Sequence, residues 1–214
     1  MNSKRKDVKT YALMKLILIF TWVVILIGCE KNDIVRESDF KESTRALKDF
    51  KESKGNSYQY TSSGSSWSGN SWKTEIIVEK GEVTGRKFYF THYARVTRPA
   101  SGWTESEISQ VLDELNTTEE EFLANNGKNL RDVLEWEEGK EGLNSHRNSS
   151  PATSPVTLDQ IYAKAQSDWL LTRNDATTYL ETENDGMISL CGYVENGCMD
   201  DCFIGIHIDS IVGL

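Results

Sequence analysis

The sequence predicts an α+β fold, with a mostly antiparallel sheet of about five to six strands and helices packed on one face. Segments rich in β-branched and aromatic residues form two groups, one in each half of the chain. Segments with helical spacing of apolar residues precede the first group and separate the two groups. Because strands and helices do not alternate singly, the pattern argues against a parallel βαβ sheet and favours a helical or loop insertion at about 99–155.

The first half of the chain is expected to contain one helix followed by three strands. In Asp39–Ser53, apolar residues recur near helical spacing and Gly55 follows. The expected strands are 58–62, 72–80 and 83–96. In the third strand, Phe88 and Phe90 point one way while Tyr89 points the other, so one face is expected to be buried and the other partly wet.

The middle of the chain is expected to be helical. Thr104 and Glu107 match a capping box, in which each side chain accepts the backbone N–H of the other residue. Further helices are expected from Thr117 or Thr118, at Leu130–Trp136 and, after a surface loop at 139–154, at 158–169. The second group of strands is expected at 176–183, 187–193 and 203–212.

The N-terminus predicts export. Five basic side chains within the first fifteen residues precede an uncharged run of 13 residues, Leu16–Gly28. A run of this length suits the apolar core of a signal peptide and is shorter than the ~20 residues that span a bilayer as a helix. A cleaved signal is therefore favoured over a permanent anchor.

The end of this run, Leu26-Ile27-Gly28-Cys29, resembles the lipobox of bacterial lipoprotein precursors. The resemblance implies that residues 1–28 are removed, that Cys29 carries a diacylglycerol thioether, and that the new amino terminus is acylated. We then expect a lipidated tether at 29–38 and a single globular domain at 39–214, held on a membrane of the bacterial cell envelope. The alternative is an uncleaved N-terminal anchor with an incidental Cys29. Glu30, in place of Asp, favours delivery to the outer membrane.

Four short segments also resemble a family of bacterial lipoproteins whose domain has no assigned function. They are Ser57-Tyr58-Gln59-Tyr60, Val78-Glu79-Lys80-Gly81-Glu82-Val83, Thr157-Leu158-Asp159-Gln160-Ile161-Tyr162 and Ile204-Gly205-Ile206-His207-Ile208. This family has no catalytic motif to transfer, so the resemblance implies no active site.

The charge balance limits the partners. The chain has 24 basic and 33 acidic side chains, a net charge of −9. Residues 1–28 hold five of the basic and one of the acidic side chains, so the processed chain has 19 against 32, a net charge of −13. This charge opposes binding to nucleic acid and to anionic lipid. The expected partners are the membrane, through the N-terminal lipid, and an envelope protein or component.

Three cysteines remain if Cys29 is alkylated, and oxidation is expected in an exported protein. If Asn196-Gly197 forms a two-residue hairpin turn, Cys191 lies opposite Cys202, with Cα atoms ~5.5 Å apart, within disulfide range. A Cys191–Cys202 disulfide is therefore expected, and Cys198–Cys202 is the alternative.

No catalytic residue, metal site or cofactor is expected. The spacing Cys-x6-Cys-x3-Cys with His207 is not typical of zinc sites, and no calcium-binding loop is present. The segment Gly64–Gly69 misses Gly-x-Ser-x-Gly by one residue. Acidic runs such as Glu135, Glu137 and Glu138 are interpreted as solvated helix faces.

Large aromatic side chains are the positive indication of function, because they are typical of recognition surfaces. The expected binding surface consists of Trp67, Trp103, Tyr89 and Tyr93, although each of them could instead belong to the core. We expect a non-catalytic lipoprotein domain that binds a ligand through its sheet face and aromatic loops. The alternative is an envelope hydrolase or a thiol-dependent enzyme that uses Cys198 or a pair of acids.

Overall fold

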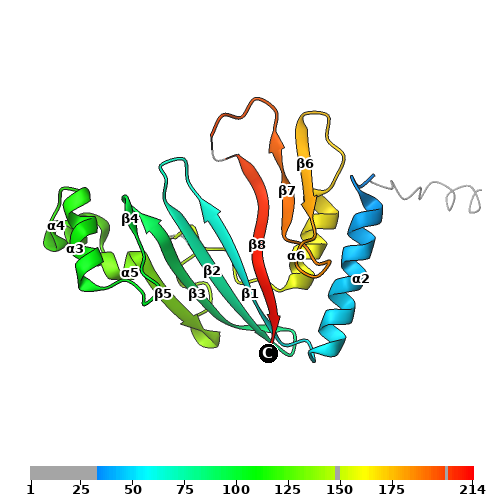
Figure 1. Cartoon of the computed structure of the whole chain (residues 1–214), viewed down its shortest axis with the longest axis horizontal. Coiled ribbons are helices and arrows are strands. Elements are labelled where there is room, and N and C mark those ends of the chain that lie inside the picture. Colours follow the sequence, from blue (N-terminus) through cyan, green and yellow to red (C-terminus); the bar gives the residue numbers. More distant parts are fainter. Residues whose placement is uncertain (1–32, 148–149, 201) are drawn as a thin grey trace, which may run out of the picture. The chain divides into compact units, whose positions relative to one another are not determined.

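The structure, a computed structural model, describes residues 33–147, 150–200 and 202–214. Its centre is an eight-stranded sheet in which neighbouring strands pair antiparallel (Figure 1). The strand order is β4-β3-β2-β1-β8-β7-β6, and β5 pairs with the same edge of β3 as β4 does. The strands are β1 (Tyr58–Ser65), β2 (Ser71–Glu79), β3 (Glu82–Tyr93), β4 (Val96–Thr97), β5 (Glu135–Gly139), β6 (Ala176–Glu181), β7 (Leu190–Glu195) and β8 (Phe203–Gly213).

Helices precede the sheet and separate its two groups of strands. They are α2 (Glu37–Ser53), α3 (Glu105–Glu114), α4 (Glu119–Asn126), α5 (Leu130–Leu134) and α6 (Leu158–Lys164), with a 3-10 turn η1 (Lys140–Gly142) and a π-helical turn η2 (Ala165–Trp169). The predicted capping box at Thr104 and Glu107 begins α3, and boxes of the same kind begin α4 and α6. The predicted α+β fold with a helical insertion is confirmed.

The six predicted strands are present, and two short strands were not predicted. One of them, β5, lies in a segment that the sequence predicts to continue as helix. The helix instead ends at Leu134, and Glu135–Gly139 pairs with the outer edge of β3. Trp136 lies opposite Phe88, and the two rings stack with centroids 5.3 Å apart. Pairing with an open sheet edge therefore outweighed the local preference for helix.

A buried ion pair joins β3 to β5. Glu138, predicted to lie on a solvated face, is buried opposite Arg86. Arg86 Nε donates to Glu138 Oε2 over 2.8 Å, and Nη1 donates to the carbonyl of Thr153 over 3.1 Å. The Glu138 carboxylate also accepts hydrogen bonds from the backbone N–H groups of Asn144 and His146. The prediction was wrong because strand pairing, not helical spacing, decides where this side chain points.

The core consists of two clusters on the helix-covered side of the sheet. In Figure 1, α2 and α6 lie beside β6–β8, whereas α3, α4 and α5 lie beyond β3–β5. The first cluster includes Leu47, Tyr58, Tyr60, Ile161, Cys191 and Ile208. The second cluster includes Phe88, Phe90, Trp103, Val111, Leu130 and Leu134. Each group of helices therefore covers its own part of one sheet.

The N-terminal boundary of the domain differs from the prediction. The predicted tether runs to Ser38, but α2 begins at Glu37, and residues 29–32 lie outside the described residues. Ile34 forms a bridge with Leu171 and packs against the first core cluster. The apolar side chain of Ile34 therefore anchors the residues before α2 to the core, and residues 33–214 form one compact unit.

Candidate functional site

The sheet splits between β1 and β8. These strands pair from Tyr58–Gly213 to Ser63–His207, with one bulge that leaves Asp209 without a partner in β1. Continued in register, the ladder would pair Gly64 with Ile206 and then Ser65 with Gly205, and no pairing in the described part of the chain joins either pair. The backbone N–H and C=O groups of alternate residues in a strand point toward the same neighbouring strand. Ser65 and Gly205 lie two residues beyond the last pair, Ser63–His207, so their backbone groups point into the space between β1 and β8. The β1–β2 and β7–β8 hairpins therefore diverge beyond Ser63 (Figure 1).

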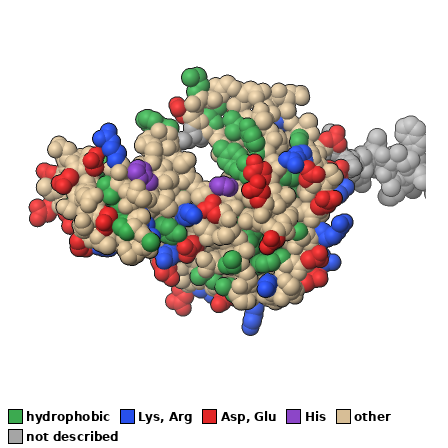
Figure 2. All heavy atoms as spheres, viewed as in Figure 1, with side chains coloured by type: hydrophobic (Ala, Val, Ile, Leu, Met, Phe, Trp, Pro, Cys, Tyr) green, Lys and Arg blue, Asp and Glu red, His purple; other side chains and the backbone are tan. Residues whose placement is uncertain are grey.

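A cleft of about 1040 Å³ lies at this split. The two hairpins, the segment 151–156 and the α6–η2 helix line it. Figure 2 shows the hollow, with hydrophobic and histidine side chains at its edges. Its large apolar lining residues are Trp72, Val156, Ile161, Trp169, Leu190, Phe203 and Ile206. These side chains form apolar walls around an opening where the sheet is interrupted.

A pair of glycines shapes the β8 wall. Gly192 and Gly205 lie opposite each other on β7 and β8. A Cβ atom at Gly192 would lie 2.6 Å from Phe203 Cζ, and one at Gly205 would lie 2.7 Å from the same atom. The Phe203 ring thus occupies space that these two residues leave free, and it is held against the strand at the edge of the cleft.

The cleft is nearly neutral although the chain is acidic. Among the described residues that line it, no Asp or Glu is present. Lys164 also lines the cleft, and its Nζ lies 2.8 Å from Asp168 Oδ2. The Asp168 carboxylate therefore balances the positive charge of Lys164. Apolar walls with a few neutral polar groups are typical of sites that hold uncharged or amphipathic ligands.

A polar cluster lies at the last pair of the β1–β8 ladder, where Ser63 and His207 line the cleft. Ser63 Oγ lies 2.6 Å from Asp209 Oδ1 and 2.9 Å from His207 Nδ1. Lys73 Nζ lies 2.9 Å from Asp209 Oδ2. Partial burial of the Asp209 carboxyl opposes ionisation, but the hydrogen bond from Ser63 and the charge of Lys73 together lower the pKa of Asp209 below its ordinary value. Asp209 is therefore held as a carboxylate.

This cluster does not have the order of a hydrolase triad. In a triad, histidine lies between serine and the acid so that it can take the serine proton. Here Ser63 lies in the middle and donates a hydrogen bond to Asp209, while His207 Nδ1 is 3.7 Å from Asp209 Oδ1. The arrangement orients His207 and fixes the last rung of the β1–β8 ladder, but it does not activate Ser63 as a nucleophile through His207.

The cysteine pairing corrects the prediction. The disulfide joins Cys198 to Cys202, the predicted alternative, and not Cys191 to Cys202. Cys191 lies opposite Ile206, because the β7–β8 connection is longer than a two-residue turn. Its free thiol faces the core, where burial raises its pKa to about 12. A thiol enzyme built on Cys198 has no free thiol to use in this structure.

The predicted aromatic surface does not form as one patch. Trp67 is 78% exposed at the tip of the β1–β2 hairpin. Trp103 is 3% exposed and its Nε1 donates to the carbonyl of Phe90, so it belongs to the core. Tyr93 packs against Phe90, and Tyr89 lies under the Arg98 guanidinium on the open face of the sheet. The prediction was wrong for Trp103, because this side chain is buried in the core.

The sequence did not predict that the cleft residues Ser63, Trp72 and His207 lie together, or that Asp209 lies next to them. Trp72, His207 and Asp209 lie in predicted strands and Ser63 directly follows one, but the contact between Ser63 and His207 spans 144 residues. Within the described ranges, no group of three or more His, Cys, Asp or Glu residues is placed to hold a metal ion. Cys29, the predicted lipidation site, lies outside these ranges, and no helix within them is long and apolar enough to cross a bilayer.

Comparisons of the chain with protein-family models, with curated proteins and with solved structures found no match.

Proposed function

We propose that the chain is a lipid-anchored lipoprotein of the bacterial cell envelope whose domain is a non-catalytic binding module. The basic segment, the apolar run and the lipobox ending at Cys29 support the anchor. The cleft between the two diverging hairpins supports the binding role. Outer-membrane delivery, favoured by Glu30, is part of the same proposal.

The single observation that carries the binding role is the split of the sheet between β1 and β8. A continuous antiparallel ladder would leave no space there, yet the ladder stops at Ser63–His207 and a cleft of about 1040 Å³ follows. The opening combines apolar walls, nearly balanced charge and backbone groups at Ser65 and Gly205 that no pairing between the described parts of β1 and β8 uses. We infer an elongated ligand with an apolar body and uncharged hydrogen-bonding groups.

Photocrosslinking in cells that make the full chain tests this role. p-Benzoylphenylalanine in place of Ser154, an exposed residue of the cleft, should yield a discrete adduct that mass spectrometry can identify. The matched control is the same substitution at Ser109, an exposed serine on α3 that does not line the cleft. Equal adducts at both positions, or none at Ser154, would contradict ligand binding in the cleft.

Globomycin, which inhibits the lipoprotein signal peptidase, tests the anchor. Treated cells should accumulate a precursor that still contains residues 1–28, and mass spectrometry of the untreated product should show an acylated Cys29 as its first residue. An unmodified Cys29 in an uncut chain would refute the proposed anchor.

A further inference from the structure

Four exposed hydrophobic side chains lie at the ends of the two hairpins that line the cleft, and we call them the rim. Trp67 projects from the tip of the β1–β2 hairpin. Met199, which is 92% exposed, lies in the β7–β8 connection, and Phe203 and Ile204 follow at the start of β8. Large apolar side chains gathered at loop tips are typical of surfaces that contact another apolar phase.

The rim lies at the same end of the domain as the start of α2. At the opposite end, Gly81 N donates to the carbonyl of Asn56, and Leu214 N donates to the carbonyl of Ser57. From that end, the 17 residues of α2 extend about 25 Å back to Glu37. The eight residues of β1 run about 27 Å to the hairpin that carries Trp67.

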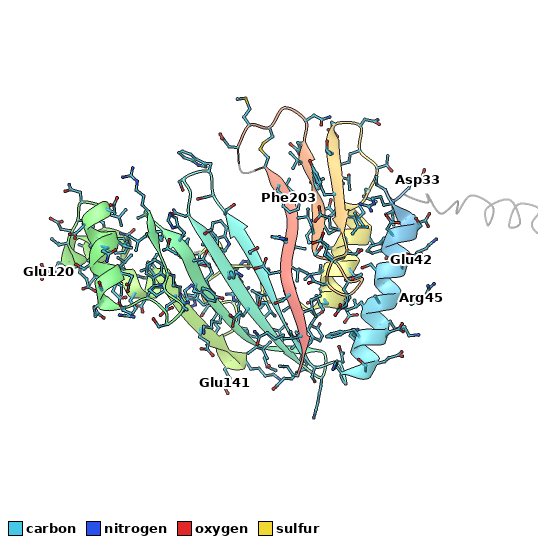
Figure 3. The ribbon with its side chains drawn as sticks, viewed as in Figure 1. Asp33, Glu42, Arg45, Glu120, Glu141 and Phe203 are labelled. Carbon is cyan, nitrogen blue, oxygen red and sulfur yellow. A yellow bond between two sulfur atoms is a disulfide. The ribbon has the colours of Figure 1, made fainter. Side chains whose placement is uncertain are left out.

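The figures agree with this arrangement. Figure 1 shows the chain's C-terminus at the lower end of the view and the tips of the β1–β2 and β7–β8 hairpins at the upper end. In Figure 3, Asp33 and Phe203 both lie in the upper part of the domain. The chain therefore enters the domain on the side where the rim is exposed.

The length of chain before Asp33 limits how far this end can lie from a lipid attached to Cys29. Cys29 precedes Asp33 by four residues, which span at most about 14 Å when fully extended. Asp33 is fixed to the domain, because its carbonyl accepts hydrogen bonds from the backbone N–H and the hydroxyl of Thr172. An acylated Cys29 would hold the rim end of the domain next to the bilayer.

We propose that the rim contacts the bilayer surface, so that the cleft opens toward the membrane that carries the lipid anchor. This inference rests on the proposed anchoring at Cys29. The hairpin tip Ser66–Asn70 carries no charge, whereas Asp200 adjoins Met199, so the rim lies at the level of the lipid headgroups and not in the hydrocarbon core. Because the processed chain has a net charge of −13, burial of apolar surface drives this contact, and anionic lipid is not required.

The experiment uses the full processed chain in vesicles of phosphatidylcholine that contains brominated acyl chains, which quench nearby tryptophan fluorescence. The probe is the difference in fluorescence between the wild type and Trp67→Ser, because this difference isolates Trp67 from the other tryptophans. We expect brominated lipid to lower the Trp67 signal at least twofold relative to unbrominated vesicles.

Two positions on β8 provide a matched pair of variants. Ile204 is 42% exposed at the rim, and Val212 is 51% exposed near the opposite end of the same strand. Ile204→Ser should reduce the quenching of Trp67, while Val212→Ser should leave it unchanged.

The possible outcomes separate the two proposals. An unquenched Trp67 in a chain that stays on the vesicles, with Cys29 acylated, overturns the rim contact and leaves the anchor intact. A second copy of the chain could instead shield Trp67. Crosslinked dimers that form in the wild type and are abolished by Trp67→Ser would show this and would also overturn the rim contact. An unmodified Cys29 overturns the anchor and, with it, this inference. Selective quenching of Trp67 that depends on Ile204 and not on Val212 supports the inference.

Discussion

Arg86 and Glu138 form an ion pair inside the domain, where Nε of Arg86 lies 2.8 Å from Oε2 of Glu138 and their side chains are 2% and 1% exposed. Arg86 Nη2 lies equally close to Oε2 but has no hydrogen-bond partner among the described residues. The Arg86 guanidinium also lies over the ring of Trp136, 4.8 Å from the centroid, and Trp136 stacks on His146. This pair joins the inserted segment to β3, next to the loop that contributes one wall of the cleft.

Removing one partner of this pair should be costly. Glu138→Leu leaves the Arg86 charge buried and unpaired, and we expect it to lower the free energy of unfolding by about 3–5 kcal/mol. The double variant Arg86→Met/Glu138→Leu removes both charges and should lose at least about 2 kcal/mol less than the single variant. Urea unfolding followed by circular dichroism measures both values. Equal losses in the two variants would show that the charges do not interact as described.

Acid should weaken the domain through Glu138. Burial of the carboxyl opposes ionisation, but hydrogen bonds from His146, Asn144 and Ser145 outweigh it and lower the pKa of Glu138 to about 2, from an ordinary 4.5. A lowered pKa in the folded state contributes stability that is complete above about pH 4.5 and is lost as the pH falls toward 2. The difference between these pKa values corresponds to roughly 3 kcal/mol.

Urea unfolding between pH 6 and pH 2.5 checks this dependence. Glu138→Gln, which cannot ionise, should be less stable than the wild type at pH 6 and should lose less stability on acidification. Identical pH profiles for the two proteins would contradict the assignment to Glu138.

Gly205 should not tolerate a side chain. A Cβ atom there would lie next to the carbonyl oxygen of Cys191, 2.6 Å from the Cα of Gly192 and 2.7 Å from Phe203 Cζ, so β7 and β8 would have to move apart. We expect Gly205→Ala to cost about 2 kcal/mol or more, as overpacked sites do. The control is Gly139→Ala, because a Cβ at Gly139 meets no atom within 4 Å. A thermal melt that shows equal losses for the two variants would rule out this close approach.

The three described cysteines should differ in reactivity. Cys191 should resist iodoacetamide in the folded domain, because burial raises its pKa to about 12 and keeps the thiol protonated. Peptide mapping without reductant should recover Cys198 and Cys202 linked in one peptide. Denaturation before alkylation should make Cys191 fully reactive. Alkylation of Cys191 in the folded domain would contradict its buried position.

The sequence alone determined the local features of this chain. Alternating residues predicted the strands, a Thr–Glu pair predicted the start of α3, and the change in composition predicted the helical insertion between the two strand groups. These features depend on neighbours within a few residues, so they can be read along the chain. The N-terminal lipobox is also a local pattern, and the lipidation that it predicts awaits its test.

The tertiary structure decided which distant segments meet. The pairing of β1 with β8, its end at Ser63–His207, and the burial of Glu138 depend on partners far away in sequence, and local pattern leaves such pairings open. The β7–β8 connection likewise decided the disulfide, because its length places Cys191 opposite Ile206. The cleft exists because two hairpins diverge, and divergence is a property of the assembled sheet and not of either hairpin alone.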